Sequence, residues 1–106
     1  MIARIWHAQA AGPGADAYQR HFTGAVLPEL KSIAGFRGAY LLLERSGEGV
    51  GIQVVSLWES MEAVGRFAGD DPGVAVVGPA AQAVLTAYDR TVSHHEVVVA
   101  AWSGPH

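Results

Sequence analysis

Histidines are the side chains of this sequence best suited to acid–base chemistry, because imidazole titrates near neutral pH. The chain has five of them, His7, His21, His94, His95 and His106. His7 lies in an apolar run near the start of the chain, and His94 lies in another near its end. A histidine that faces an apolar pocket could remove a proton from a phenol or an enol. His7 and His94 are therefore the candidate catalytic bases.

Each of these histidines also has a structural explanation. A histidine in a strand is often a packing residue whose ring nitrogens are hydrogen-bonded. Neighbouring strand residues point to opposite faces, so His94 and His95 cannot hold one ion together. A metal site built from His7, His94 and Glu96 is a weaker alternative, because one strand would supply two of its three ligands. We therefore expect no metal and no other cofactor.

The stretch VVSLWES, residues 54–60, places a tryptophan where a predicted strand ends and a helix is about to begin. Strand alternation puts Val54, Ser56 and Trp58 on one face of the sheet. The Trp58 ring could form one wall of a substrate pocket. It could instead be a large apolar plug at the edge of the core.

Three further side chains are candidates for substrate binding. His21 and Phe22 lie in a predicted helix, where Phe22 belongs to the apolar stripe and His21 flanks it. Tyr40 lies in a predicted strand over residues 36–45. For Tyr40 a packing role in the core is the alternative.

The composition excludes several classes of function. The 106 residues carry a net charge of −3 and no run of lysine or arginine, which argues against nucleic acids and anionic membranes as partners. There is no cysteine, which excludes disulfides, thiolate metal sites and a cysteine nucleophile. The first residues do not resemble a signal peptide, and no apolar run approaches the roughly 20 residues of a membrane span. We expect a cytoplasmic protein with one domain over residues 1–101 and a tail at 102–106.

Six main elements are predicted along the chain, beginning with a strand over residues 1–9 and a long helix. Asp16 should cap this helix, with Gln19 as the reciprocal partner of a capping box. Pro28 lacks an N–H group and should interrupt the helix about one turn before it, and Gly35 should end it. The buried stripe is predicted from apolar side chains at helical spacing, namely Tyr18, Phe22, Ala25, Val26, Leu30 and Ile33.

The remaining elements follow in the second part of the chain. Two strands, 36–45 and 50–58, are joined by the hairpin turn SGEG and so run antiparallel. Ser60 caps the second main helix, and a short helical segment is expected near 80–88. The last strand is expected over residues 90–101.

The order of the main elements, βαββαβ, is that of a ferredoxin-like α+β fold with a four-stranded antiparallel sheet. Two helices can cover only one face of such a sheet, so the other face should be polar. The strand sequences AYLLL, VVSLW and VVVAAW are instead apolar at both alternating positions. A second copy of the chain is the simplest cover for an apolar face of a domain this small. We therefore predict a homodimer.

Three stretches, IAGFRGAYLL, VVSLWESMEAVGRFAG and VSHHEVV, resemble in order and spacing the antibiotic biosynthesis monooxygenase (ABM) domain family. The resemblance extends from Met1 to about Val99. It implies a dimeric α/β barrel, in which two ferredoxin-like sheets face each other. The family includes cofactor-free monooxygenases of aromatic polyketides as well as haem-degrading enzymes.

Site residues carry over from this family only in part. Trp58 matches the tryptophan that ends the third strand and lines the pocket in both enzyme groups. The resemblance therefore implies that the face of Trp58 is the one covered by helices, and that His7 projects into the same pocket. His7 stands at the place of an asparagine late in the first strand of the haem degraders, and Val54 replaces the asparagine of the polyketide oxygenases. The stretch DDPGVAVVGPA lacks the histidine that ligates haem in the degraders, so we expect no tight haem binding through residues 68–80.

These observations favour a small-molecule enzyme, a cofactor-independent monooxygenase that uses molecular oxygen on an aromatic polyketide-like or phenolic substrate. His7, or else His94, would remove a proton, and the resulting carbanion would reduce oxygen in a dry pocket. The same pocket could instead catalyse a non-oxidative proton transfer, as a cyclase or isomerase does. A dimeric ligand-binding or accessory protein without turnover is the alternative of another class. A cavity of roughly 300 Å³ or more that touches Trp58 and a histidine would favour an enzyme.

Overall fold

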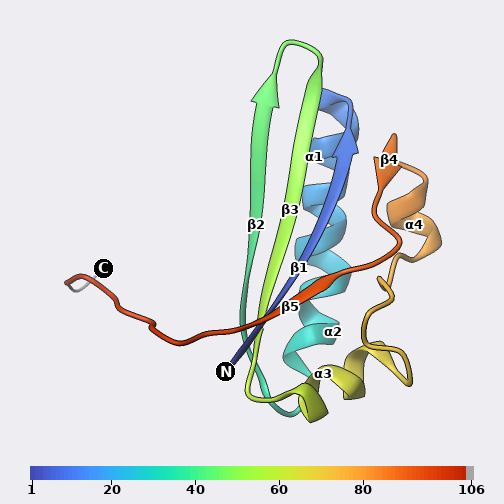
Figure 1. Cartoon of the computed structure of the whole chain (residues 1–106). Coiled ribbons are helices and arrows are strands. Elements are labelled where there is room, and N and C mark those ends of the chain that lie inside the picture. Colours follow the sequence, from blue (N-terminus) through green and yellow to red (C-terminus); the bar gives the residue numbers. More distant parts are fainter. Residues whose placement is uncertain (105–106) are drawn as a thin grey trace.

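An antiparallel sheet and the helices on one of its faces make up the protein (Figure 1). The structure is a computed structural model that describes residues 1–104, so Pro105 and His106, the last two residues of the predicted tail, lie outside the described residues. All the helices lie on the same side of the sheet, and the other face carries none of the helices of the described chain (Figure 1). No helix within these residues is long and apolar enough to cross a membrane.

Three long strands form the body of the sheet, in the order β2 (Phe36–Ser46), β3 (Gly49–Trp58) and β1 (Ile2–Ala10). Two short strands, β4 (Ala87–Tyr88) and β5 (Ser93–Glu96), both pair antiparallel with the remaining edge of β1. The ferredoxin-like α+β fold that the sequence predicts is therefore confirmed. The described sheet has five strands instead of four, because β4 forms within the segment predicted as a helix near 80–88, in addition to the last strand.

The separation of β4 from β5 has a local cause. Between β4 and β5 the chain leaves β1 and pairs with residues 73–75: the Ala75 N–H donates to the Arg90 carbonyl, and the Val92 N–H donates to the Gly73 carbonyl. The strand predicted over 90–101 is regular only in β5, and the segment after Val97 has neither helix nor strand up to Gly104. The helix predicted near 80–88 is also shorter, with α4 spanning only Pro79–Gln82.

The first helical stretch begins earlier than the sequence predicted. Helix α1 (Gly12–His21) starts just after β1, with Pro13 in its first turn, where the missing N–H group of proline costs no hydrogen bond. The prediction that Asp16 caps this helix was wrong. Asp16 lies inside α1, and its carboxylate accepts a hydrogen bond of 3.2 Å from Arg45 on β2.

The predicted interruption by Pro28 is confirmed. A π-helical turn, Phe22–Val26, separates α1 from α2 (Leu27–Lys31), and the Leu27 N–H donates to the Phe22 carbonyl five residues earlier. Helix α2 ends at Lys31, four residues before the predicted end. Gly35 has a φ of +92°, and a Cβ there would lie 2.5 Å from the Cβ of Ala63, so only glycine fits at this crossing.

The predicted buried stripe of this helical stretch is correct at most of its positions. Tyr18, Phe22 and Leu30 are buried, while Val26 and Ile33 are half-buried. Ala25 is exposed, because the π-helical turn rotates it away from the sheet.

Helix α3 (Met61–Ala68) follows β3 and closes one end of the helical layer. The predicted cap is confirmed, since the Ser60 hydroxyl accepts a hydrogen bond of 3.2 Å from the Ala63 N–H. Gly69, with a φ of +80°, ends the helix. The cap at Ser60 thus starts α3 three residues after the end of β3.

The two faces of the sheet differ in what covers them. Residues of even number in β1 and β3, such as Trp6 and Trp58, point toward the helices, and we call this side the helix-covered face. The opposite side, the open face, carries apolar side chains without a cover: Ala3, Ile5, Tyr40, Leu42, Val55 and Leu57. Of these, Tyr40 and Leu42 are each 46% exposed. The prediction that the strands are apolar on both faces is correct for β2 and β3, but the third stretch, VVVAAW, is not part of a strand.

Candidate functional site

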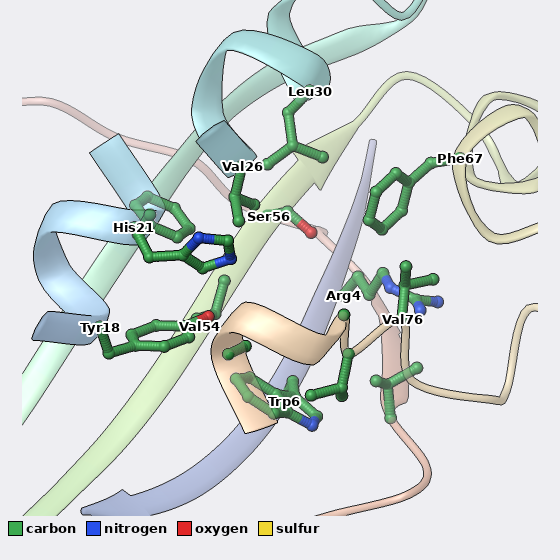
Figure 2. A pocket seen from close by; sticks show the side chains of 15 residues that line it. Arg4, Trp6, Tyr18, His21, Val26, Leu30, Val54, Ser56, Phe67 and Val76 are labelled. Atoms are coloured by element: carbon green, nitrogen blue, oxygen red, sulfur yellow. The ribbon is translucent and has the colours of Figure 1, made fainter. Parts of the chain in front are cut away.

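A small cavity lies on the helix-covered face, between the sheet and the helices (Figure 2). Its volume is about 70 Å³. The strands β1 and β3 supply its floor, and the helical stretch from α1 to α2 supplies one side. The coil segment Val76–Gly78, together with Ala81 and Phe67, supplies the other side. The walls are mainly apolar, with four polar side chains among them: Arg4, Tyr18, His21 and Ser56.

Aromatic rings form one part of the wall. The ring centres of Trp6 and Tyr18 are 6.0 Å apart, and those of Tyr18 and Phe22 are 6.4 Å apart. The Trp6 indole N–H donates to the backbone carbonyl of Asp89 at 2.8 Å, which fixes the ring at the cavity edge. Burial raises the pKa of Tyr18 to about 12, so its phenol is neutral at physiological pH.

Arg4 is the charged residue of the cavity wall, and it is only 5% exposed. Its Nη1 donates to the Pro72 carbonyl and its Nη2 donates to the Val74 carbonyl at 3.0 Å. The guanidinium carbon lies 5.7 Å from the centre of the Phe67 ring, within cation–π range. Burial lowers the pKa of Arg4 from its ordinary value. Arg4 thus joins the sheet to the coil segment that follows α3.

His94 lies beside Arg4, because it is paired with Arg4 across β5 and β1. Its Nε2 is 3.1 Å from Nη1 of Arg4. A guanidinium only donates, so Nε2 must carry a lone pair and the ring proton must lie on Nδ1. Burial lowers the pKa of His94, and the charges of Arg4 and His95 lower it further. His94 is therefore a neutral partner of Arg4, and the lone pair it would need as a base is already engaged.

Trp58 is a core residue and does not line the cavity. Its side chain is 0% exposed, and its ring stacks on Phe67 at 5.8 Å and meets the edge of Phe36 at 5.3 Å. Its indole N–H donates to the Ser56 hydroxyl at 2.9 Å, and it is Ser56 that faces the cavity. The prediction that the Trp58 ring forms a pocket wall was therefore wrong. The aromatic side chains around it fill the space that a ligand would need.

His7 lies on the open face, on the other side of the sheet from Trp58. Its side chain is 57% exposed, and its Nδ1 is 3.8 Å from a carboxylate oxygen of Asp89. The prediction that His7 and Trp58 share a pocket was wrong, because neighbouring residues of a strand point to opposite faces and Trp6 takes the inward position. His7 cannot reach a molecule in the cavity.

The remaining predicted site residues divide between the two faces. His21 and Phe22 both line the cavity, as the sequence predicted, and the half-buried His21 ring lies 6.1 Å from the ring of Tyr18. Tyr40 is on the open face, away from the cavity. Arg4 and Trp6 were missed as cavity residues, although strand alternation places both on the face of Ser56.

The site offers no evident place for a metal ion. No group of three or more histidine, aspartate or glutamate side chains within residues 1–104 could hold one. The segment 68–80 contains no histidine, so no imidazole from it could ligate a haem iron.

The cavity is smaller than the size expected above for the pocket of an enzyme. The volume of about 70 Å³ is below the roughly 300 Å³ at which pockets for drug-sized ligands begin, and the cavity touches His21 but not Trp58. A larger ligand would need the coil segment over the cavity to move.

Comparison with known proteins shows the fold. No protein-family model matches the sequence, and no curated protein matches it. Among solved structures, a Bacillus cereus protein provisionally named an antibiotic biosynthesis monooxygenase is 16% identical, with a TM-score of 0.66 over 99% of this chain and 98% of that chain. The haem degrader MhuD from Mycobacterium tuberculosis, with two haems bound in its active site, is 24% identical, with a TM-score of 0.60 over 96% and 100% of the two chains.

A variant of MhuD with two manganese protoporphyrins bound per active site matches as well. It is 22% identical and has a TM-score of 0.69 over 97% of this chain and 100% of that chain. At these identities the likeness concerns the fold. The resemblance to the ABM family that the sequence indicates is confirmed at that level.

Proposed function

We propose that this protein binds a small aromatic or enolisable molecule in the cavity and oxidises it with molecular oxygen, without a metal or a flavin. The observation that carries the proposal is that the imidazole of His21 and the rings of Trp6, Tyr18 and Phe22 line one apolar space. Aromatic walls suit a planar substrate, and an imidazole suits proton removal near neutral pH. The shared fold with proteins named as monooxygenases supports the same direction.

The reaction follows from the acidity of the substrate. His21 removes a proton from an activated carbon, and the resulting carbanion transfers electrons to oxygen and forms a carbon–oxygen bond. The hydroperoxide then loses water, which breaks the oxygen–oxygen bond and leaves a carbonyl group where two hydrogens were bound. One oxygen atom enters the product and the other leaves as water, so no external reductant is needed. A cavity that excludes bulk water protects the carbanion from simple reprotonation.

His21 takes the role that the sequence favoured for His7 or His94. His7 lies on the open face, and the Nε2 lone pair of His94 is engaged by Arg4. His21 is half-buried at the cavity wall and makes no side-chain hydrogen bond among the described residues. It is therefore the histidine best placed to meet a substrate.

An aromatic substrate requires the cavity of about 70 Å³ to open. The wall most able to move is the coil between α3 and α4, residues 69–78, which forms neither helix nor strand apart from one bridge between Val74 and Thr91. Val76 in this segment is 53% exposed although it also lines the cavity. Outward movement of the last part of this coil, residues 76–78, would enlarge the cavity without breaking the sheet or the hydrogen bonds of Arg4 to Pro72 and Val74.

A second copy of the chain is the proposed cover of the open face. Tyr40 and Leu42 are large, apolar and half-exposed there, and the segment after β5 adds Val98, Val99 and Trp102, which are 73–80% exposed. Figure 1 shows this segment running away from the rest of the chain. Sedimentation at micromolar concentration should show a species of two chains, and Leu42→Asp should reduce it to one. A wild-type protein that stays monomeric would contradict this proposal.

Oxygen uptake tests the proposed chemistry. Phenols and hydroquinones of increasing size are added to the protein, and dissolved oxygen and products are followed together. His21→Gln should reduce turnover by about 10²–10⁴-fold, the usual contribution of a general base. His95→Gln is the matched control, because His95 is exposed on the open face and should leave turnover unchanged. Equal turnover in His21→Gln and wild type would contradict the assignment.

Two other functions remain as outcomes of the same experiment. Substrate that is converted equally well without oxygen would indicate a proton-transfer enzyme, such as a cyclase or isomerase. A ligand that binds and is never converted would indicate a binding or accessory protein. Of these two, the small volume of the cavity and the tight packing of Trp58 favour the binding or accessory protein over the proton-transfer enzyme.

A further inference from the structure

Arg4 is a buried cation without an acidic partner. No carboxylate oxygen of the described residues lies within 4.0 Å of its guanidinium nitrogens, whereas Arg37, Arg45 and Arg66 each have such a partner. These three arginines are at the surface, where an ion pair adds little stability. The one arginine that most needs a negative partner therefore lacks one, although its side chain is 5% exposed.

The protein satisfies only part of the hydrogen-bonding capacity of Arg4. A guanidinium has five N–H groups. Nη1 uses two of them, toward the Pro72 carbonyl and Nε2 of His94, and Nη2 uses one toward the Val74 carbonyl. One N–H on Nε and one on Nη2 make no hydrogen bond to the described residues. Both free N–H groups can donate to a carboxylate, which is the negative group that a guanidinium binds most readily.

The position of Arg4 brings its side chain to the edge of the proposed ligand site. Arg4 lines the cavity, and Figure 2 shows it on the opposite side of the cavity from His21, with the Ser56 hydroxyl between them. Of the four polar side chains in the wall, Arg4 is the one that carries a permanent positive charge, so a negative group of a ligand would find its partner at the Arg4 end. An apolar ring would then extend toward Trp6 and Tyr18.

We infer that the cavity, once the coil segment over it has moved outward, takes a planar aromatic molecule that carries a carboxylate, and that the carboxylate pairs with Arg4. This inference rests on the proposed function for what happens to the molecule afterwards, but binding does not require turnover. With the carboxylate fixed at Arg4, the ring presents its far side to His21. The pairing would select acids over neutral molecules of the same shape.

Benzoate and benzamide form a matched pair for the test, because they share size and planarity and differ in charge. Calorimetric titration of wild-type protein in the absence of oxygen should show benzoate binding about tenfold tighter than benzamide. Added salt should weaken benzoate binding and leave benzamide binding unchanged. Equal affinity for the two compounds, or binding of neither at millimolar concentration, would overturn the inference.

Substitutions of arginine test whether the preference for benzoate over benzamide depends on Arg4. Arg4→Gln should bring the two affinities together, whereas Arg66→Gln, which changes a surface arginine paired with Glu62, should leave the preference intact. If Arg4→Gln does not fold, Arg4→Lys should retain a reduced preference, because lysine keeps the charge without the paired N–H groups. A full preference in Arg4→Gln, or an unreduced preference in Arg4→Lys, would place the anion elsewhere.

The oxygen experiment separates this inference from the proposed function. A preference for benzoate that depends on Arg4, together with no oxygen uptake for any aromatic acid, would leave the anion site in place and refute the monooxygenase. Oxygen uptake with neutral phenols, and no preference for benzoate, would support the monooxygenase and refute the anion site.

Discussion

Two tryptophans on the same face of the sheet have opposite surroundings. Trp58, at the end of β3, is 0% exposed and lies between the rings of Phe36 and Phe67. Trp6, in the middle of β1, is 9% exposed and borders the cavity, with Tyr18 as its aromatic neighbour. Both indole N–H groups are hydrogen-bonded, Trp58 to the Ser56 hydroxyl and Trp6 to a backbone carbonyl.

The two tryptophans differ in how completely the side chains around them fill the space between sheet and helices. Near Trp58 the helices α2 and α3 both reach the sheet, and Leu30, Ala63 and Val64 complete a closed apolar cluster. Near Trp6 the covering elements are the π-helical turn and a coil segment, which leave a gap. The cavity therefore lies where the helical layer is least regular, and its residues are available for a ligand.

The largest expected effect is that of removing the closed cluster. Trp58→Ala should destabilise the protein by about 3–5 kcal/mol, because it leaves a cavity among rings that cannot close over it. Trp6→Ala should cost clearly less, since Trp6 already borders an empty space. Chemical denaturation of both variants checks the comparison. Equal losses would mean that the two surroundings do not differ in packing.

A smaller effect is expected from the hydroxyl that joins the two regions. Ser56→Ala should cost about 1–3 kcal/mol, because the buried indole N–H of Trp58 then has no acceptor. Ser93→Ala is the control, since Ser93 is exposed and its hydroxyl contacts only the exposed His95. If Ser56→Ala were neutral in thermal unfolding, the Ser56–Trp58 bond would not contribute to the closed cluster.

The hydrogen bond of Trp6 should contribute less to stability than the bond between Ser56 and Trp58. Trp6→Phe keeps a ring at the cavity edge but removes the donor to the Asp89 carbonyl, and a loss of about 1 kcal/mol is expected. The hydrogen exchange of backbone amides near β4 should increase with it, because Asp89 follows that strand. Unchanged exchange there would show that the indole does not hold this part of the chain.

The smallest expected effect is a dependence of stability on pH through His94. Its pKa is lowered in the folded state, so the unfolded chain takes up the proton first as the pH falls. The contribution of the neutral ring is therefore complete above 6.5, the ordinary pKa of histidine, and is lost as the pH decreases toward the folded-state value. His94→Gln keeps an acceptor for Arg4 without a titrating group. This variant should show a weaker decline in unfolding free energy between pH 7 and about pH 5 than wild type. An identical decline would exclude His94 as its cause.

Strand alternation predicted much of the fold but could not by itself identify the pocket. It correctly placed Val54, Ser56 and Trp58 on one face, and the resemblance correctly identified that face as the helix-covered one. His7 was assigned to the pocket by likeness to the family, although it has the opposite parity. A shift of one residue in a strand exchanges its faces, so Trp6 and not His7 points inward.

The rest of the site depends on contacts between distant segments. Phe67 on α3 fills the space beside Trp58, and nothing in the local sequence of either residue indicates that they stack. The partners of Arg4 lie 68, 70 and 90 residues away along the chain. The separation of β4 from β5 likewise depends on the pairing of residues 90–92 with residues 73–75. Such packing follows from the whole fold and not from any periodic pattern.

The indole N–H signals of the three tryptophans in a nitrogen-15 NMR spectrum test the central claim most directly, since they report on the cavity, the closed cluster and the tail. The signals can be assigned by replacing Trp6, Trp58 and Trp102 in turn with phenylalanine. If the cavity beside Trp6 is the ligand site, titration with benzoate should move the Trp6 signal strongly. The Trp58 signal should move little and the Trp102 signal not at all. A shift of Trp58 with Trp6 unchanged would show that the ligand enters the closed cluster and would contradict the proposed site.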